Sequence, residues 1–346
     1  GNGKLSLADE QVPLVFFQDF ERTVDGDLRA LLDDSDMLPV KEATDVVLHG
    51  SAHARSRTRE LHVGLAVSGF ARRLLVTGER HVEVSADGAP RFSSPEHFEK
   101  LALAHTVAYG GYDAHAHDLL DPPPPPPAPS PLDRELGPDL RTAQPPPRYP
   151  GVFAYPRNHA GVGYFIDVDR RRADGAALPQ VEDPEDLLTP ARFFVPSPTA
   201  WIDGPIPGSF GWVAPAWYPR LVRCAGPLFP VDVPTRPLRE AALGDGDDLL
   251  GPFAPIGVMH PRALQGAAPG LARERLRGDE PVVLENLHAQ RAELRFRLPG
   301  EAPRFVMRPP ELKAMTPRSI LQTLRIEPDR DRVILTWIGV LPLAAP

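Results

Sequence analysis

The sequence contains one cysteine, Cys224, which excludes an internal disulfide framework and a cysteine-rich metal site. It has no basic tract, and its net charge of −8 argues against a nucleic-acid-binding surface. No stretch approaches the roughly 18 to 20 unbroken apolar residues of a membrane span. A charged segment followed by an apolar core is also missing at the start, so no signal peptide is predicted. We therefore expect a cytoplasmic protein that does not insert into membranes.

Proline is abundant instead, at 44 of 346 residues, and 42% of the chain is apolar. Proline breaks helices and is tolerated at strand edges and in turns. Because these prolines lie between apolar stretches that alternate as strands do, the composition predicts a globular β-rich fold with stiff loops.

The clearest strand patterns lie near the two ends of the chain. "TRELHVGLAVSG" alternates apolar and small or polar residues and then turns into "FARRLLVTG", which predicts a hairpin over residues 58–78. "LQTLRIEPDRDRVILTWIGV" predicts two strands around a Glu-Pro-Asp turn, with Val333, Leu335 and Trp337 facing inward. The fold class is therefore mainly β: two antiparallel sheet regions, arranged like a sandwich, joined by a Pro/Gly-rich loop region with few short helices.

The chain divides by composition into three parts. Residues 1–118 form an N-terminal β region, and residues 150–346 form a loop-rich middle and a C-terminal β region that packs with it as one domain. Between them, 119–149 contains "DPPPPPPAPSP", an exposed polyproline connection that is a spacer or a docking ligand for an aromatic groove. Short helices are expected at 261–278 and in "EDLLTPARFF".

Two histidines raise the possibility of a metal site. His115 and His117 lie two residues apart in "GYDAHAHD", and on a strand they would share one face and grip one metal ion. The polyproline run that follows favours a surface loop. A metal-dependent hydrolase using these histidines is one alternative function.

The stretch "YPRNHAGVGYFID" combines Tyr155, Arg157, Asn158 and Tyr164 around a Gly-Val-Gly turn. Pro156 restricts Tyr155 to extended geometry, and Asn158 is suited to bond its own backbone. A structural corner that supports a sheet needs these residues, and so does a ligand pocket. The structural interpretation is favoured.

A second aromatic stretch, "SFGWVAPAWYPR", holds Phe210, Trp212, Trp217, Tyr218 and Arg220. Aromatic and arginine side chains are common anchors in protein interfaces. One reading places one tryptophan in the core and the other toward a partner, so that this stretch and the Tyr155–Tyr164 corner form a docking surface. The other reading buries both tryptophans.

Several stretches resemble, in order, the type VI secretion accessory proteins catalogued as domain of unknown function twenty-one sixty-nine. They include "SDMLPVKEATDVVLHGSAHA", "RRLLVTGER", "VAYGGYD", "YPRNHAGVGY", "LPQVEDPEDLLTP", "GPIPGSFGWVAPAWYPRLVRCAG", "RGDEPVVLENL" and "LRIEPDRDRVILTWIGVLPL". The resemblance runs from about Gly3 to Leu343. His159 stands where the family usually has proline, and the strand that usually begins family chains is missing.

This resemblance implies a non-enzymatic adaptor or chaperone that loads a toxin effector onto a spike or spike-tip protein. It implies no cofactor and no catalytic residues. Apart from the metal-dependent hydrolase, the remaining alternative is a carbohydrate- or ligand-binding β module that uses exposed tryptophan and tyrosine.

Overall fold

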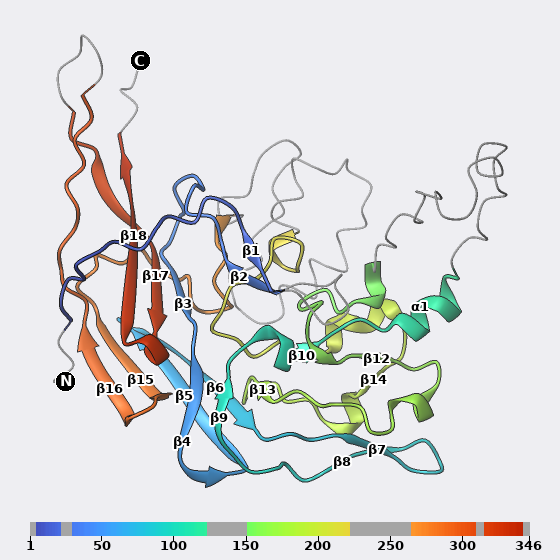
Figure 1. Cartoon of the computed structure of the whole chain (residues 1–346). Coiled ribbons are helices and arrows are strands. Elements are labelled where there is room, and N and C mark those ends of the chain that lie inside the picture. The colour runs from blue at the N-terminus through green and yellow to red at the C-terminus, as the bar shows by residue number, and fades with distance from the viewer. Residues whose placement is uncertain (1–4, 22–29, 123–150, 222–263, 309–314, 342–346) are drawn as a thin grey trace, which may run out of the picture.

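The computed structural model describes residues 5–21, 30–122, 151–221, 264–308 and 315–341. It confirms the predicted mainly β fold, and α1 (Ala114–Leu120) is the one α-helix that lies wholly within these residues. The larger sheets lie at the left of Figure 1, and the loop-rich middle of the chain lies at the right. Most of the predicted 119–149 connection falls outside the described residues, as does Cys224.

The largest sheet has five strands and is antiparallel throughout. Its strands are, in order across the sheet, β13 (Val181–Glu182), β6 (Phe70–Thr77), β5 (Glu60–Val67), β15 (Pro281–His288) and β16 (Arg291–Arg297). β5 and β6 form the predicted hairpin, and Ser68 turns the chain with a φ of 54°. Because β15 pairs with β5, strands from the two ends of the chain share this sheet.

The second sheet has three strands, in the order β18 (Arg332–Val340), β17 (Arg318–Glu327) and β3 (Asp45–Leu48). β17 and β18 are the predicted C-terminal hairpin, closed by the 3-10 turn η9 (Pro328–Arg330) and by Asp331, which has a φ of 49°. β3 pairs with β17 in parallel, so this sheet also joins the two ends of the chain.

Shorter pairs complete the fold. The antiparallel ones are β1 (Asp19–Phe20) with β2 (Leu31–Asp33), β4 (Ser51–Thr58) with β9 (Phe98–Ala102), and β7 (Val82–Val84) with β8 (Pro90–Phe92). The parallel ones are β10 (Tyr109–Gly110) with β11 (Val162–Gly163), and β12 (Phe165–Ile166) with β14 (Phe194–Val195). The 3-10 turns of the middle region are η1 (His105–Val107), η3 (Gly151–Phe153), η4 (Arg170–Ala173), η5 (Pro190–Arg192) and η6 (Pro198–Asp203).

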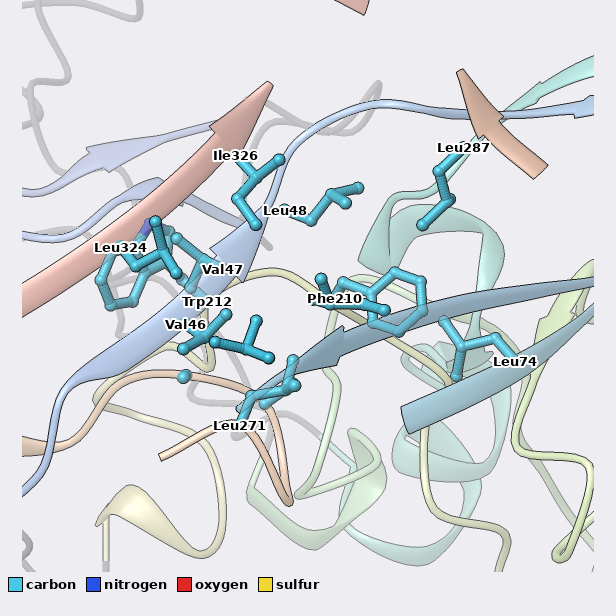
Figure 2. Close-up of a cluster of buried hydrophobic side chains, with 14 of the residues drawn as sticks. Val46, Val47, Leu48, Leu74, Phe210, Trp212, Leu271, Leu287, Leu324 and Ile326 are labelled. Atoms are coloured by element: carbon cyan, nitrogen blue, oxygen red, sulfur yellow. The ribbon is translucent and has the colours of Figure 1, made fainter. Parts of the chain in front are cut away.

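Two apolar clusters hold these parts together. The first joins both sheets to side chains from the loops; Figure 2 shows Phe210, Trp212 and Leu271 packed among strand residues such as Val46 and Leu324. Val333, Leu335 and Trp337 pack against this cluster from β18, as predicted. The second cluster fills the loop-rich middle and is largely aromatic, with Tyr109, Tyr155, Tyr164, Phe193, Trp201 and Tyr218 among its members.

The helix expected at 261–278 is wrong, because residues 264–278 form no α-helix. Pro269 and Gly270 interrupt the segment, and its carbonyl groups are used elsewhere. Leu271 O accepts a hydrogen bond from Val46 N, and Glu274 O accepts one from Thr44 N. The segment therefore lines the outer edge of β3. The second expected helix, in "EDLLTPARFF", contains only the turn η5.

Candidate functional site

The Tyr155–Asp167 stretch forms a corner that is bonded to the neighbouring segment at Gly111. Tyr155 N donates to Gly111 O at 2.8 Å, and Gly111 N donates to Asn158 O at 2.9 Å. Asn158 N closes the turn by donating to Tyr155 O at 2.9 Å. Gly163 then adopts a φ of 92°, a conformation that favours glycine, as β11 pairs with β10.

Arg157 is held inside this corner by acceptors of the fold itself. Its Nη1 donates to Tyr155 Oη at 2.9 Å and to Gly204 O at 2.9 Å. The guanidinium carbon lies 5.3 Å from the centroid of the Trp201 ring, within cation–π range. Arg157 therefore binds the η6 loop to the corner, a role that needs no ligand.

Asn158 is fully buried, and its side chain makes three hydrogen bonds. Its Nδ2 donates to His105 O at 2.8 Å and to Tyr109 O at 3.1 Å, and its Oδ1 accepts from Ala160 N at 3.2 Å. Both ends of the amide are thus satisfied within the chain. These contacts match the structural interpretation of the corner.

Tyrosine side chains fill the space beneath the corner. The Tyr155 ring lies 4.8 Å from that of Tyr109 and 5.3 Å from that of Tyr164. Tyr155 Oη donates to Pro205 O at 2.7 Å. Burial raises the pKa of all three hydroxyl groups, so each stays protonated at neutral pH. The predicted partner-binding residues Tyr155 and Tyr164 are therefore neutral core aromatics.

The structure buries the stretch that the sequence suggested as a docking surface. Trp212 is 3% exposed and Trp217 is 2% exposed, and Phe210, Tyr218 and Arg220 are buried beside them. Arg220 pairs with Asp34 at 2.6 Å and donates to Val213 O at 3.0 Å. The reading in which both tryptophans are core residues thus matches the structure, because a partner reaches neither of them at the surface.

A serine–histidine contact that sequence reasoning missed lies beside Trp217. His105 Nε2 lies 3.0 Å from Ser209 Oγ, and Ser209 Oγ also accepts from Gly211 N at 2.9 Å. Burial lowers the pKa of His105 to about 4, so the imidazole is neutral at pH 7. Both side chains are buried, which keeps a substrate away from the hydroxyl. The residues are more than a hundred positions apart in the sequence, and no motif there signals the contact.

The expected location of His115 and His117, on a strand or a surface loop, is wrong, because both lie on α1. Residues two apart on a helix diverge by about 200°, so the two rings do not share one metal ion. His115 is exposed, whereas His117 is buried, stacks on Phe153 at 4.2 Å and lies 2.6 Å from Tyr112 Oη. No metal-binding group of three or more side chains occurs among the described residues.

None of the tryptophan side chains is exposed enough to stack against a sugar ring. Trp201, Trp212 and Trp217 are buried, and Trp337 is half-buried against the first apolar cluster. The chain has four tryptophans in all. The alternative of a carbohydrate-binding module with exposed tryptophan therefore finds no support in this structure.

Exposed apolar side chains gather instead near the N-terminus. Val15 N donates to the Asp36 side chain at Oδ2 at 2.9 Å, and Asp36 N donates to Val15 O at 2.8 Å, so the segments before β1 and after β2 stay adjacent. We call residues 14–20 and 31–37 the acidic ribbon. Its exposed apolar residues are Leu14, Phe16, Phe17, Leu32 and Met37. Its acidic residues are Asp19, Asp33, Asp34 and Asp36, and it contains no lysine or arginine.

Comparison with known proteins gives one match. The model of a family described as "Uncharacterized protein conserved in bacteria (DUF2169)" matches residues 1–338. This confirms the expected DUF2169 family, while the link to type VI secretion stays a prediction. No curated protein and no solved structure matches the chain. Within the described ranges, no helix has the length and apolar character to cross a membrane.

Proposed function

This chain belongs to the DUF2169 family of bacterial proteins, and we propose that it is a non-enzymatic accessory protein of type VI secretion. In this proposal it acts in the cytoplasm as an adaptor or chaperone that binds a toxin effector, a spike protein or a spike-tip protein before delivery. The secretion context rests on the resemblance of the ordered stretches. The binding role rests on the acidic ribbon.

The acidic ribbon supports a binding role because it exposes several large apolar side chains on two adjoining segments. Phe17 is 87% exposed and Phe16 is 60% exposed. The bonds between Val15 and Asp36 hold the segment that carries Leu14 next to the segment that carries Met37. Grouped apolar side chains with a polar rim are typical of interaction sites, whereas single exposed ones need no explanation.

The charge of the acidic ribbon indicates the chemistry of the partner. Asp33 pairs with Arg325 and Asp34 with Arg220 on the inner side, while Asp19 is exposed. Glu21 adjoins the ribbon, and residues 5–21 contain no basic side chain beside Asp19 and Glu21, although Arg22 follows directly. A partner segment that alternates apolar residues with lysine or arginine would complement this surface, and its affinity would fall with added salt.

The proposal is tested with Phe17→Ser and with any toxin or spike protein whose gene adjoins the gene of this protein. Truncation of a central apolar anchor costs about 2 kcal/mol, or roughly thirty-fold in Kd. We expect that loss by calorimetry, at an unchanged melting temperature, because Phe17 lies outside both apolar clusters.

The matched control is Leu119→Ser, which removes an apolar side chain that is 57% exposed on α1. It should bind like the wild type. Equal affinity of Phe17→Ser and the wild type would rule out the acidic ribbon as the binding surface. If the wild-type chain bound none of the toxin or spike proteins encoded beside it, the accessory role itself would be refuted.

A further inference from the structure

The sheet edges of this protein differ in how they are protected. An unpaired edge exposes N–H and C=O groups that bind any available strand, so proteins cover such edges or place charges on them. The outer edge of β3 is covered by loops: Val46 N donates to Leu271 O and Leu48 N donates to Phe210 O, both at 2.9 Å. This edge of the three-stranded sheet is therefore closed.

The five-stranded sheet protects its two edges in other ways. β13 is only two residues long, and Glu182 forms a bridge with Pro207. β16 carries charge on four of its seven positions, Arg291, Glu293, Arg295 and Arg297. Charged side chains in a row discourage the approach of another strand. Neither edge favours association.

Among the residues that the structure describes, none gives β18 such protection. It is nine residues long, and after Arg332 its sequence "VILTWIGV" contains no charge and no proline. Within the described ranges it pairs with β17 on one side and with no strand on the other (Figure 1). A long, apolar and uncharged edge of this kind is a binding site for another strand.

The register shows which polar groups of β18 are free to bind. Ile326 O accepts a hydrogen bond from His49 N, so Ile326 directs its polar groups toward the side of β3. Ile326 pairs with Val333 on β18. Because the polar groups of Ile326 point away from β18, this is a non-hydrogen-bonded pair, and Val333 directs its own N–H and C=O away from β17. The alternation along β18 extends this orientation to Leu335, Trp337 and Gly339.

We propose that β18 pairs edge to edge with β18 of a second copy of this chain, in an antiparallel arrangement with a two-fold axis at Thr336. In this register Leu335 pairs with Trp337 of the second copy, and Val333 pairs with Gly339. All four residues with outward-directed polar groups are then hydrogen-bonded. The result is one continuous six-stranded sheet across a symmetric dimer.

The side chains of β18 fit this self-pairing. Thr336 meets its own copy, and Ile334 meets Ile338, so β-branched residues oppose one another on the face away from the core. Leu335 and Trp337 form an aromatic–aliphatic pair, which also stabilises adjacent strands. The charge of Arg332 falls opposite Val340, so no like charges are brought together. A second copy therefore satisfies both the backbone and the side chains of this edge.

Thr336 provides a specific test because it is the position that meets itself. Its own N–H and C=O point toward β17, and its side chain lies on the opposite face from Val333 and Leu335, which pack against the core. Thr336→Lys and Thr336→Asp should each dimerise at least about tenfold more weakly than the wild type in sedimentation equilibrium, because like charges would face each other. An equimolar mixture of the two variants should dimerise again.

Thr336→Val is the matched control and should dimerise like the wild type. A wild-type chain that stays monomeric at high micromolar concentration would overturn the proposal. So would a dimer that both charged variants leave intact, because its interface would then lie elsewhere.

If a charged variant unfolds, a cross-linking experiment tests whether two copies of β18 pair at Thr336. In a Cys224→Ser background, Thr336→Cys should form an intermolecular disulfide on oxidation, because non-hydrogen-bonded antiparallel neighbours lie about 4.5 Å apart at Cα. Glu293→Cys, on the charged edge strand β16, is the control and should remain monomeric. Equal cross-linking of both variants would overturn the proposal. Dimerisation and partner binding are measured separately, so failure of one leaves the other standing.

Discussion

Acidification is expected to destabilise this protein through His105. The imidazole is buried in the first turn after β9, 3.0 Å from Ser209 Oγ and edge-on to the Trp217 ring, with centroids 5.0 Å apart. Burial disfavours the charged form and lowers the pKa of His105 from 6.5 to about 4. Protonation in the folded protein would place an imidazolium against an indole and a serine hydroxyl, away from water.

The sign of the effect follows from this lowered pKa. Below about pH 6.5 the unfolded chain binds a proton at His105, while the folded chain binds one only near pH 4. The contribution of neutral His105 to the free energy of unfolding is therefore fully present well above pH 6.5, and it is lost as the pH decreases toward 4. Between pH 7 and pH 5 the linkage relation gives a loss of about 2 kcal/mol in the free energy of unfolding from this one group.

The assay is urea denaturation of the wild type and His105→Gln at pH 7 and at pH 5. Glutamine does not titrate, so the difference between the two pH values should be smaller by about 2 kcal/mol in the variant, whatever its stability at pH 7. His62→Gln, at an exposed position of β5, should keep the wild-type difference. An unchanged pH difference in His105→Gln would refute the reasoning.

Two further substitutions test the corner and the helix beside it. Gly110 has a φ of 152°, and a Cβ atom there would overlap Asn158 O, so Gly110→Ala should cost about 3 kcal/mol or more by denaturation. Gly69→Ala, where a Cβ atom meets nothing within 4 Å, should stay within about 0.5 kcal/mol, and equal losses at both positions would contradict this. The buried Asp113 carboxylate pairs with Arg172 and caps α1 by accepting from Ala116 N at 3.0 Å. Asp113→Asn should therefore lower the stability by about 3 kcal/mol, and an unchanged melting temperature would show that the pair contributes nothing.

Local patterns in the sequence determined the hairpins. Alternation of apolar residues predicted β5 and β6, and the turn between β17 and β18 was visible as Glu-Pro-Asp. Both hairpins form between neighbouring segments, so their pairing depends on periodicity and turn residues that lie within a few positions of each other. The inward side of β18 was predictable for the same reason.

The tertiary structure alone decided which distant segments meet. β3 pairs with β17, and β15 with β5, across more than two hundred residues, and no local pattern selects such partners. The same holds for α1, which is too short to be stable alone and is supported by the Asp113 cap and by the stacking of His117 on Phe153.

The candidate site shows this division most clearly. The sequence left Trp212 and Trp217 open as interface anchors or core residues, because composition cannot distinguish the two when both require the same apolar side chains. Their exposure depends on what packs over them. Trp212 packs against strand residues such as Val46 and Leu324, and Trp217 lies against His105. Phe16 and Phe17 remain at the surface because neither packs into the two apolar clusters.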